Sequence, residues 1–392
     1  MDYLTFIDRI ARRAPQAPEI QYLVSGSDAA VRKRVLSGVV RKCRERGRPL
    51  VVISDSGGTE PDDLNVVQTC GYKLENGMSG DYFLFNPFQR INAVDGLSQI
   101  RQLLDILEYD EKRKGKLTSY LSFIRHMELL EKGGAGLELT LEKLGEYCTA
   151  LAVEQKLQKL VDERIITEAQ RMTYLAKYTE CAAAGADFED MFFLLMPFTR
   201  EDGKRLGADP NEAVLFSTGV LAEDEHMRNL ILKLLQFGLK AQSDQSIAVI
   251  VLDKGYGSRK GLVNLMLALP AHVEAHIFSG DVFTWCGADE LAMILNRFPA
   301  RVFSRHTAMS SAQAIERACG DIEVVKKTYN VTYDRRWSAN TPWDMLMGNN
   351  KTENFGQMAP VREPRYHKET VLQLAPGTGI VEFMGSSSIF SL

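Results

Sequence analysis

The chain has 392 residues, of which 45% are hydrophobic and 25% are charged, a composition typical of a globular protein with room for two or three domains. The formal net charge of −4 excludes a polycationic nucleic-acid-binding chain, and no apolar run is long enough to cross a bilayer. The opening Met1-Asp2-Tyr3 is unlike a secretory signal, and the six cysteines form no Cys-x-x-Cys pair, so we expect a reducing cytoplasm without disulfides or structural zinc.

Short apolar runs bounded by Gly, Pro, Asn or Asp recur along the chain and predict strands. They cover 21–26, 49–54, 82–85, 213–217, 247–253, 275–278 and 300–304. Runs that are apolar throughout are typical of strands buried on both faces, as in a parallel sheet between two helical layers. Helical patterns separate most of them, which favours βαβ units and an α/β fold.

One region, from about residue 96 to residue 195, breaks this alternation because it contains no strand-like run. Helical patterns cover 97–107, 117–130, 139–160 and 167–183, and Thr167 with Gln170 has the spacing of a capping box. We therefore predict three parts. These are 1–95 as the first half of a nucleotide-binding-type domain, 96–200 as an inserted all-α domain, and 201–392 as the second half. Residues 333–363 are predicted to be an irregular connection.

The turn after the first strand invites comparison with a phosphate-binding loop, written Gly-x-x-x-x-Gly-Lys-Ser/Thr. The eight residues from Gly26 read G-S-D-A-A-V-R-K. The strand, the first glycine and the following helix are present, so backbone amides could face an anion. However, Val31 stands in the place of the second glycine, Arg32 in that of the lysine, and Lys33 in that of the hydroxyl that binds Mg²⁺. Asp28 adds a carboxylate where an anion would bind.

A second signal of nucleotide chemistry is a strand that ends in an acidic residue. Residues 247–252 form an apolar run that ends at Asp253, the type of residue that holds Mg²⁺ in Walker B motifs. The next residue is Lys254, whereas hydrolysing enzymes usually have Glu there to orient the attacking water. An apolar strand that ends in Asp is common in α/β proteins, so this signal is weak by itself.

Taken in order, these motifs resemble those of the type IV coupling proteins of conjugation and secretion. This TraG/TraD-like family belongs to the RecA-like translocases, in the lineage of HerA and FtsK. The resemblance adds the Asp turn "VVISDSGG" at 51–58, the Asn-Pro element "FLFNPF" at 83–88 and the helical insertion after it. It also includes "ARVFSRHTAMSSAQAIERACG" at 300–320 and "PRYHKETVLQLAPGTGIVEF" at 364–383. It implies a RecA-like, mostly parallel sheet flanked by helices, with an inserted all-α domain.

The resemblance also implies a function, and the residues that depart from the nucleotide-binding motifs change what we expect of it. We expect a coupling-ATPase-like component that has lost hydrolysis, a pseudo-ATPase adaptor for protein or DNA. An active DNA translocase and a nucleotide-binding regulator without turnover are the alternatives. Expected partners are proteins of a secretion or conjugation apparatus, with DNA and further copies of the chain left open. The expected location is the cytoplasm, with the inner face of the membrane as an option.

The residues that would carry this chemistry follow from the motifs. We predict no catalytic residue and no metal site, and no cofactor unless ATP and Mg²⁺ bind. The nucleotide-binding candidates are Gly26, Ser27, Asp28, Arg32, Lys33 and Asp253, and Arg305 is the candidate for an arginine finger that reaches a neighbouring subunit.

Three further patterns have a structural and a functional interpretation. Eight Lys or Arg residues and one acid lie between Arg32 and Arg48, either as the solvated face of a helix or as a phosphate-binding stripe. His272 and His276 have metal-like spacing only in a helix, whereas a strand would hold them more than ~10 Å apart. Trp337 and Trp343, near Arg335-Arg336, are either buried anchors or a recognition loop.

Overall fold

A computed structural model of the chain describes residues 20–391. The described part omits 55–60, 86–93, 132–146, 148, 200–202, 222–223, 243–245, 255–257, 271, 330–355 and 384. Several sequence motifs fall on the omitted positions. The second half of the Asp turn (55–58), the Asn-Pro pair and the Trp337–Trp343 segment therefore lie outside the described residues.

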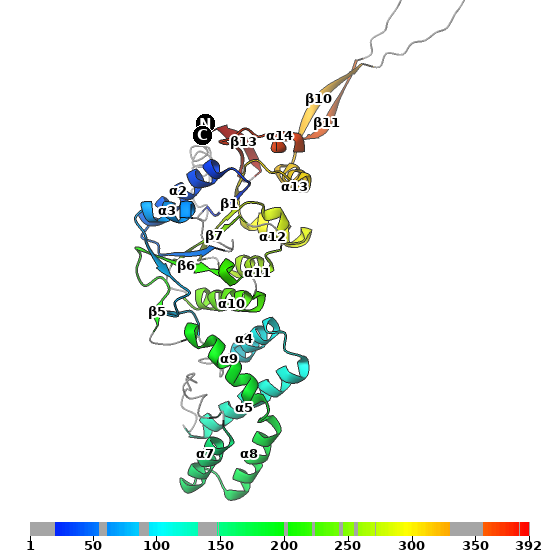
Figure 1. Ribbon diagram of the computed structural model, residues 1–392. Helices are drawn as coiled ribbons and strands as arrows, with labels where there is room; N and C mark the ends of the chain where they lie inside the picture. Colours follow the sequence, from blue (N-terminus) through cyan, green and yellow to red (C-terminus); the bar gives the residue numbers. More distant parts are fainter. Residues whose placement is uncertain are drawn as a thin grey trace, which may run out of the picture.

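The core is a nine-stranded sheet with the order β13-β12-β9-β1-β8-β7-β2-β6-β3 (Figure 1). Seven neighbouring strands are parallel: β1 (Tyr22–Ser25), β2 (Leu50–Ser54), β3 (Lys73–Asn76), β6 (Glu212–Ser217), β7 (Ala248–Asp253), β8 (Glu274–Ser279) and β9 (Ala300–Phe303). Only β12 (Thr378–Phe383) and β13 (Ser386–Ser391), at one edge, are antiparallel. The predicted α/β fold with a mostly parallel sheet is confirmed.

Helices cover both faces of this sheet, which explains why the strands are apolar throughout. On one face α2 (Ala29–Glu45) and α3 (Pro61–Thr69) pack on side chains such as Val24 and Val52. On the other face α10 (Glu225–Ala241), α11 (Lys260–Ala268), α12 (Ala288–Arg297) and α13 (Met309–Cys319) pack on the alternate residues, such as Leu23 and Val51. The parallel register brings the carboxyl ends of β1, β7, β8 and β9 to one edge.

Most described residues between Val94 and Thr199 are helical, and these helices extend away from the sheet region (Figure 1). The helices are α4 (Val94–Ile106), α5 (Glu111–Glu131), α7 (Ala150–Asp162), α8 (Glu168–Cys181) and α9 (Ala184–Thr199). The predicted capping box of α8 is present, with Thr167 and Gln170 bonded reciprocally. None of the described helices combines the length and the apolar character that a bilayer-spanning segment needs.

Two segments differ from the sequence expectation. The run at 82–85 does not join the main sheet, because β4 (Tyr82–Phe83) pairs with β5 (Lys204–Arg205). The stretch predicted as irregular, 333–363, includes all but the last residue of β11 (Gly356–Pro364). This strand pairs with β10 (Asp321–Tyr329) in a ribbon that projects from the body (Figure 1). Neither strand of this ribbon has the continuous apolar character that identified the core strands. Three short helices complete the described chain: η1 (Thr218–Leu221), η2 (Val282–Thr284) and α14 (Lys368–Leu372).

Candidate functional site

The turn between β1 and α2 is fixed by backbone hydrogen bonds to two neighbouring strand ends. The Gly26 amide donates to the Ser279 carbonyl at 3.1 Å, and the Ser27 amide donates to the Arg305 carbonyl at 2.9 Å. Gly26 has φ +138°, and a Cβ atom there would lie 2.0 Å from the Ser304 hydroxyl oxygen. Glycine is therefore required at this position by close packing against the chain itself.

The Asp28 carboxylate occupies the start of α2. Its Oδ1 atom accepts hydrogen bonds from the Ala30 amide at 2.9 Å and the Val31 amide at 3.0 Å. Its Oδ2 atom accepts one from the Gly377 amide at 2.7 Å. Amides at a helix N-terminus are the groups that bind a phosphate in nucleotide sites, and a carboxylate satisfies them in the same way. The chain thus supplies its own anion to this position.

Arg32, which stands where a phosphate-binding loop has lysine, turns toward α3. Its Nη2 atom lies 2.9 Å from Oδ2 of Asp63, and the two side chains are only 4% and 2% exposed. Burial lowers the pKa of the Arg32 guanidinium and raises that of the Asp63 carboxyl, although each group opposes the other's shift. For each of the two groups, burial therefore affects the pKa more than its partner's charge does.

Lys33 is bound on the same side of α2. Its Nζ atom lies 2.8 Å from Oδ2 of Asp62, at the start of α3, and its side chain is 41% exposed. Both cations of the predicted phosphate site are thus directed to carboxylates of α3. The sequence spacing places Arg32 and Lys33 near the head of α2, but it does not show that Asp62 and Asp63 would lie opposite them.

Asp253 lies at the carboxyl end of β7 and is fully buried. Its Oδ2 atom accepts a hydrogen bond from Trp285 Nε1 at 2.9 Å and lies 3.4 Å from Arg259 Nε. Its charge also acts on Arg32 and favours the protonated guanidinium. The indole of Trp285 and the guanidinium of Arg259 therefore lie against the carboxylate that was expected to hold Mg²⁺. Sequence reasoning missed Trp285 and Arg259, because both lie in segments without a recognised motif.

Arg305, the candidate finger, contributes its backbone rather than its side chain to this region. Its carbonyl accepts from both the amide and the hydroxyl of Ser27, the latter at 2.9 Å. The Arg305 side chain is exposed and makes no ion pair with the residues that the structure describes. The structure brings Arg305 next to the turn, and its role toward a neighbouring subunit stays a prediction.

A buried polar cluster supports the turn from below. Ser25 Oγ lies 3.0 Å from His306 Nε2, and His306 Nδ1 lies 2.9 Å from the Ser304 carbonyl. Because a carbonyl only accepts, Nδ1 carries the proton and Nε2 accepts from Ser25. Burial lowers the pKa of His306 more than the nearby Asp281 raises it. Ser311 in turn donates to Asp281 at 2.6 Å. This enclosed network fixes the ends of β1, β8 and β9.

Much of the basic stripe between Arg32 and Arg48 is also paired inside the protein. Besides Arg32 and Lys33, Arg46 and Arg48 contact Glu274, and Arg44 bonds to Asn211 and lies 5.4 Å from the Tyr72 ring centre. Most of these side chains neutralise local acids or pack on the surface. The geometry favours the structural interpretation of the stripe, and DNA binding there stays a prediction.

The His272-x-x-x-His276 spacing does not produce a helical metal site, because β8 begins at Glu274 and places His276 within the sheet. His276 Nδ1 accepts from the Tyr22 amide at 3.2 Å, and Nε2 donates to Glu274 at 2.9 Å. Cys43 lies close enough to complete a group of three metal-type side chains. However, the ring nitrogens of His276 and the carboxylate of Glu274 already have protein partners, which favours a structural role.

Comparisons with known proteins concern the fold. No protein-family model and no curated protein matches the sequence. The chain is similar in structure to VirB4 of Thermoanaerobacter pseudethanolicus, with a TM-score of 0.49, 11% identity, and coverage of 95% of this chain and 88% of that one. It is also similar to the plasmid coupling protein TrwB in complex with a GTP analogue, with a TM-score of 0.48, 12% identity, and coverage of 95% and 84%. An unbound form of the bacterial conjugative coupling protein TrwBdeltaN70 gives 0.47 at 12% identity, with the same coverage.

Proposed function

We propose that this chain is a non-hydrolysing relative of the coupling ATPases, which serves as an adaptor for protein or DNA in a conjugation or type IV secretion machine. It would act in the cytoplasm, at or near the inner face of the membrane. Residues 1–95 and 201–392 would form its RecA-like domain and 96–200 its inserted helical domain. The motif resemblance supports the pathway, and the geometry of the turn before α2 supports the loss of turnover.

The observation that carries the proposal is that the groups expected to grip a nucleotide are bound to the chain itself. The helix-terminal amides bond to Asp28, Arg32 and Lys33 pair with acids of α3, and Asp253 lies among basic and indole donors. Phosphoryl transfer depends on positioned cations and amides around the phosphates. A site whose cations and amides are already paired must break several of these contacts before it can bind a triphosphate.

The first test measures nucleotide binding and turnover by the full chain with Mg-ATP. A ligand at 100 times its Kd stabilises a protein by about 2.7 kcal/mol, so binding would raise the melting temperature measurably. We expect no shift at millimolar Mg-ATP and no hydrolysis above that of free ATP. A shift without hydrolysis would favour the regulator alternative. Hydrolysis that depends on Lys33 would favour the translocase.

A matched pair of variants tests whether Asp28 blocks the amides. Asp28→Asn keeps an oxygen acceptor at the helix start, whereas Asp28→Gly removes it and leaves the Ala30, Val31 and Gly377 amides open. We expect inorganic phosphate to raise the melting temperature of Asp28→Gly and not that of Asp28→Asn. Equal responses of the two variants would show that the carboxylate does not occupy an anion position.

A cellular test separates scaffold from motor. Deletion of the coding sequence should abolish plasmid transfer or secretion in its host, and Lys33→Ala should restore it as well as the native gene does. Lys33 is partly exposed and would be the lysine of a phosphate-binding loop one residue longer than the usual one, so a motor would lose function in this variant. Normal transfer after deletion would contradict the assignment to such a machine.

A further inference from the structure

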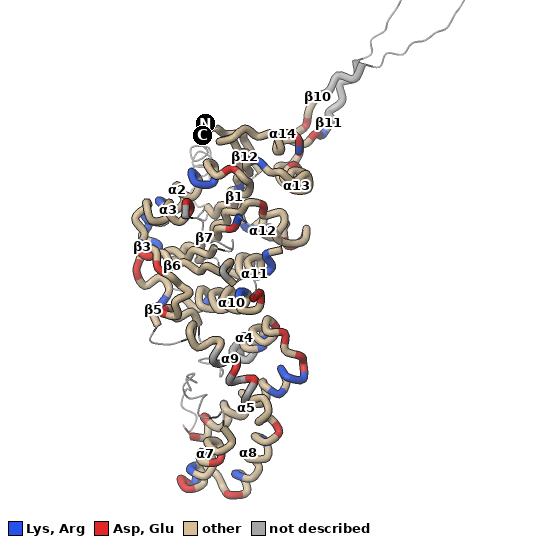
Figure 2. Tube along the Cα trace, viewed as in Figure 1, with Lys and Arg blue, Asp and Glu red and all other residues tan. Residues whose placement is uncertain are grey.

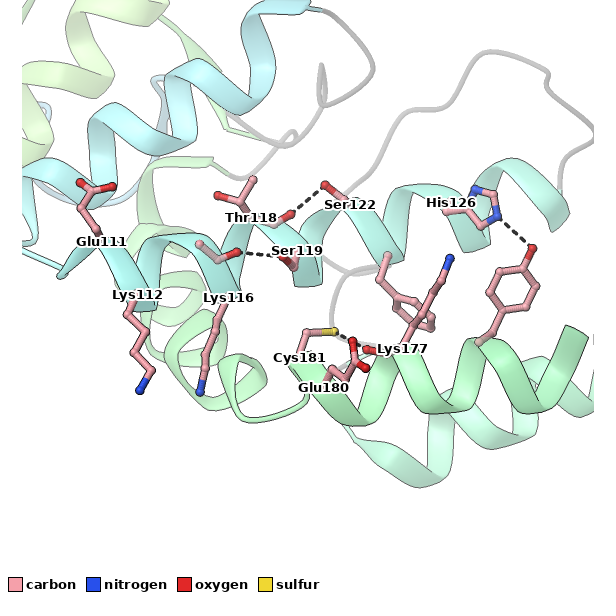
Figure 3. Close-up of a pocket in the computed structure, with 13 residues that line it drawn as sticks. Glu111, Lys112, Lys116, Thr118, Ser119, Ser122, His126, Lys177, Glu180 and Cys181 are labelled. Atoms are coloured by element: carbon pink, nitrogen blue, oxygen red, sulfur yellow. Dashed lines mark hydrogen bonds between the residues drawn. The ribbon is translucent and has the colours of Figure 1, made fainter.

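A groove between α5 and α8 in the helical bundle is a second region that could bind a ligand. It has a volume of about 830 Å³, which is large enough for a ligand of considerable size. One wall is α5, from Glu111 to His126, and the other is α8, from Tyr174 to Cys181 (Figure 3). Helix geometry gives the longer wall a length of about 23 Å at 1.5 Å per residue.

The shape of the groove follows from the residues that α5 presents to it. Gly115, Ser119 and Ser122 recur at intervals of four and three residues, so they lie on one face of the helix. The hydroxyl groups of Ser119 and Ser122 donate to carbonyls of the same helix, at 2.9 and 2.8 Å (Figure 3). Small side chains that bond back to their own backbone leave room for another helix to approach closely.

The groove also has an apolar floor and a defined end. Phe123 and Cys181 lie buried at its base, with exposed fractions of 7% and 4%. At one end His126 Nε2 and the Tyr174 hydroxyl lie 3.0 Å apart and join the two walls (Figure 3). An apolar floor between two helices is the type of surface that receives one face of an amphipathic helix.

The lysines of the groove differ from three other lysines of the bundle. Lys114, Lys156 and Lys159, which lie outside the groove, all pair with acidic side chains. Lys112, Lys116 and Lys177 line the groove and make no ion pair with any residue in the described part of the chain. Basic positions also gather at the start of α5 in Figure 2.

Two acids line the groove beside these lysines. Glu111 is already shared by Lys114 at 3.1 Å and Arg101 at 3.7 Å. Glu180 is exposed on α8 and would repel the closely spaced phosphates of a nucleic acid, but it could pair with one basic side chain of a peptide. The groove therefore presents a net positive charge next to an apolar floor, which is complementary to a helix with acidic flanks.

We propose that the α5/α8 groove is a docking site for an acidic amphipathic helix of a partner protein. The apolar face of that helix would lie over Phe123 and along the small residues of α5. Its acidic residues would pair with Lys112 and Lys116 on one side and with Lys177 on the other. This site is remote from the turn before α2, so it does not depend on the fate of nucleotide hydrolysis.

The probe for this site is a display library of 16-residue amphipathic helices, with Leu on one face and Glu, Lys or Gln at each position of the other. Selection on the full-length protein should enrich Glu. The affinity of the best peptide is then measured by fluorescence anisotropy, with a 16-base-pair DNA duplex as competitor. No enrichment, enrichment of Lys, or displacement of the peptide by DNA at equal concentration would overturn the proposal.

Variants locate the binding to the groove. Lys112→Glu/Lys116→Glu should weaken binding at least tenfold, whereas the control Lys240→Glu/Lys368→Glu, with the same change in net charge on α10 and α14, should leave it unchanged. Ser119→Trp should also weaken binding at least tenfold without any change in charge, because it fills the groove. Lys368 is half-buried and the other four positions are exposed, and circular dichroism checks the fold of each variant. Equal loss in the control pair, or full binding by Ser119→Trp, would contradict the assignment.

Discussion

The two polar regions of this protein use their charges in opposite ways. At the turn before α2, Asp28, Arg32, Lys33 and Asp253 are each bonded to another part of the chain. In the α5/α8 groove, Lys112, Lys116 and Lys177 have no acidic partner among the described residues. Charges that are paired within the fold contribute to one conformation, whereas accessible unpaired charges can contribute to binding. In the region that resembles a nucleotide site, the charged side chains therefore connect different parts of the fold.

Among the tests of this comparison, we expect the largest loss of stability from disruption of the buried Arg32–Asp63 pair. Arg32→Met leaves the Asp63 carboxylate buried without its main counter-charge, which should lower the free energy of unfolding by about 3–5 kcal/mol. Urea denaturation of the full chain measures the change. The double variant Arg32→Met/Asp63→Leu should lose less than Arg32→Met alone, because no isolated charge remains. A larger loss in the double variant would show that the pair itself is strongly stabilising.

Gly26 should give the next largest effect. Gly26→Ala places a methyl group 2.0 Å from Ser304 Oγ at φ +138°, so strand β9 or the turn must shift, at a cost of roughly 2–4 kcal/mol. Gly47→Ala is the matched control, because Gly47 also has positive φ (+63°) and has no neighbour within 4 Å of the added atom. That control should cost about 1 kcal/mol. Equal losses would mean that backbone conformation alone, and not packing on Ser304, requires Gly26.

The sequence predicted the centre of the sheet better than its edges, for a physical reason. Strands such as β2 and β7 are buried on both faces, so their apolar runs are visible in the sequence. The edge strand β13 reads Ser-Ser-Ser-Ile-Phe-Ser and β3 reads Lys-Leu-Glu-Asn, and neither has a continuous apolar pattern. Tertiary pairing with β12 and β6 determines these two strands.

The candidate site was predictable only in its local part. The spacing of Gly26, Asp28 and Arg32 placed them at the head of a helix, as observed. Their bonding partners are distant in the chain, since Gly377 lies 349 residues from Asp28. No local pattern identifies such a partner, so the sequence suggested a degraded nucleotide site but did not show which groups fill it.

The pH dependence of unfolding tests whether His306, in the buried polar cluster next to the turn, stabilises the fold in its neutral form. Burial lowers the pKa of His306 in the folded protein below the ordinary histidine pKa of about 6.5. Below pH 6.5 the unfolded chain therefore binds a proton at His306 more readily than the folded protein does. Stability should therefore be complete above pH 6.5 and should fall below it, by up to about 1.4 kcal/mol per pH unit. His306→Gln should flatten this slope between pH 5 and 6.5, whereas His367→Gln, at an exposed position, should not. An unchanged slope in His306→Gln would exclude His306 as its source.

The smallest effect on stability should come from substitution of a groove lysine. Comparison with a paired lysine of the same helical bundle shows whether the groove lysines stabilise the fold. Lys156 lies 3.0 Å from the fully buried Glu128, to which the Tyr147 hydroxyl also donates at 2.7 Å. Lys156→Met removes this cation from beside a buried carboxylate and should cost about 3 kcal/mol in urea denaturation. Lys116→Met removes an exposed charge with no acidic partner in the described part of the chain, so its effect should stay within about 0.5 kcal/mol. A loss at Lys116 comparable to that at Lys156 would mean that the groove lysines serve the fold, and their availability for an acidic partner would no longer follow from the structure.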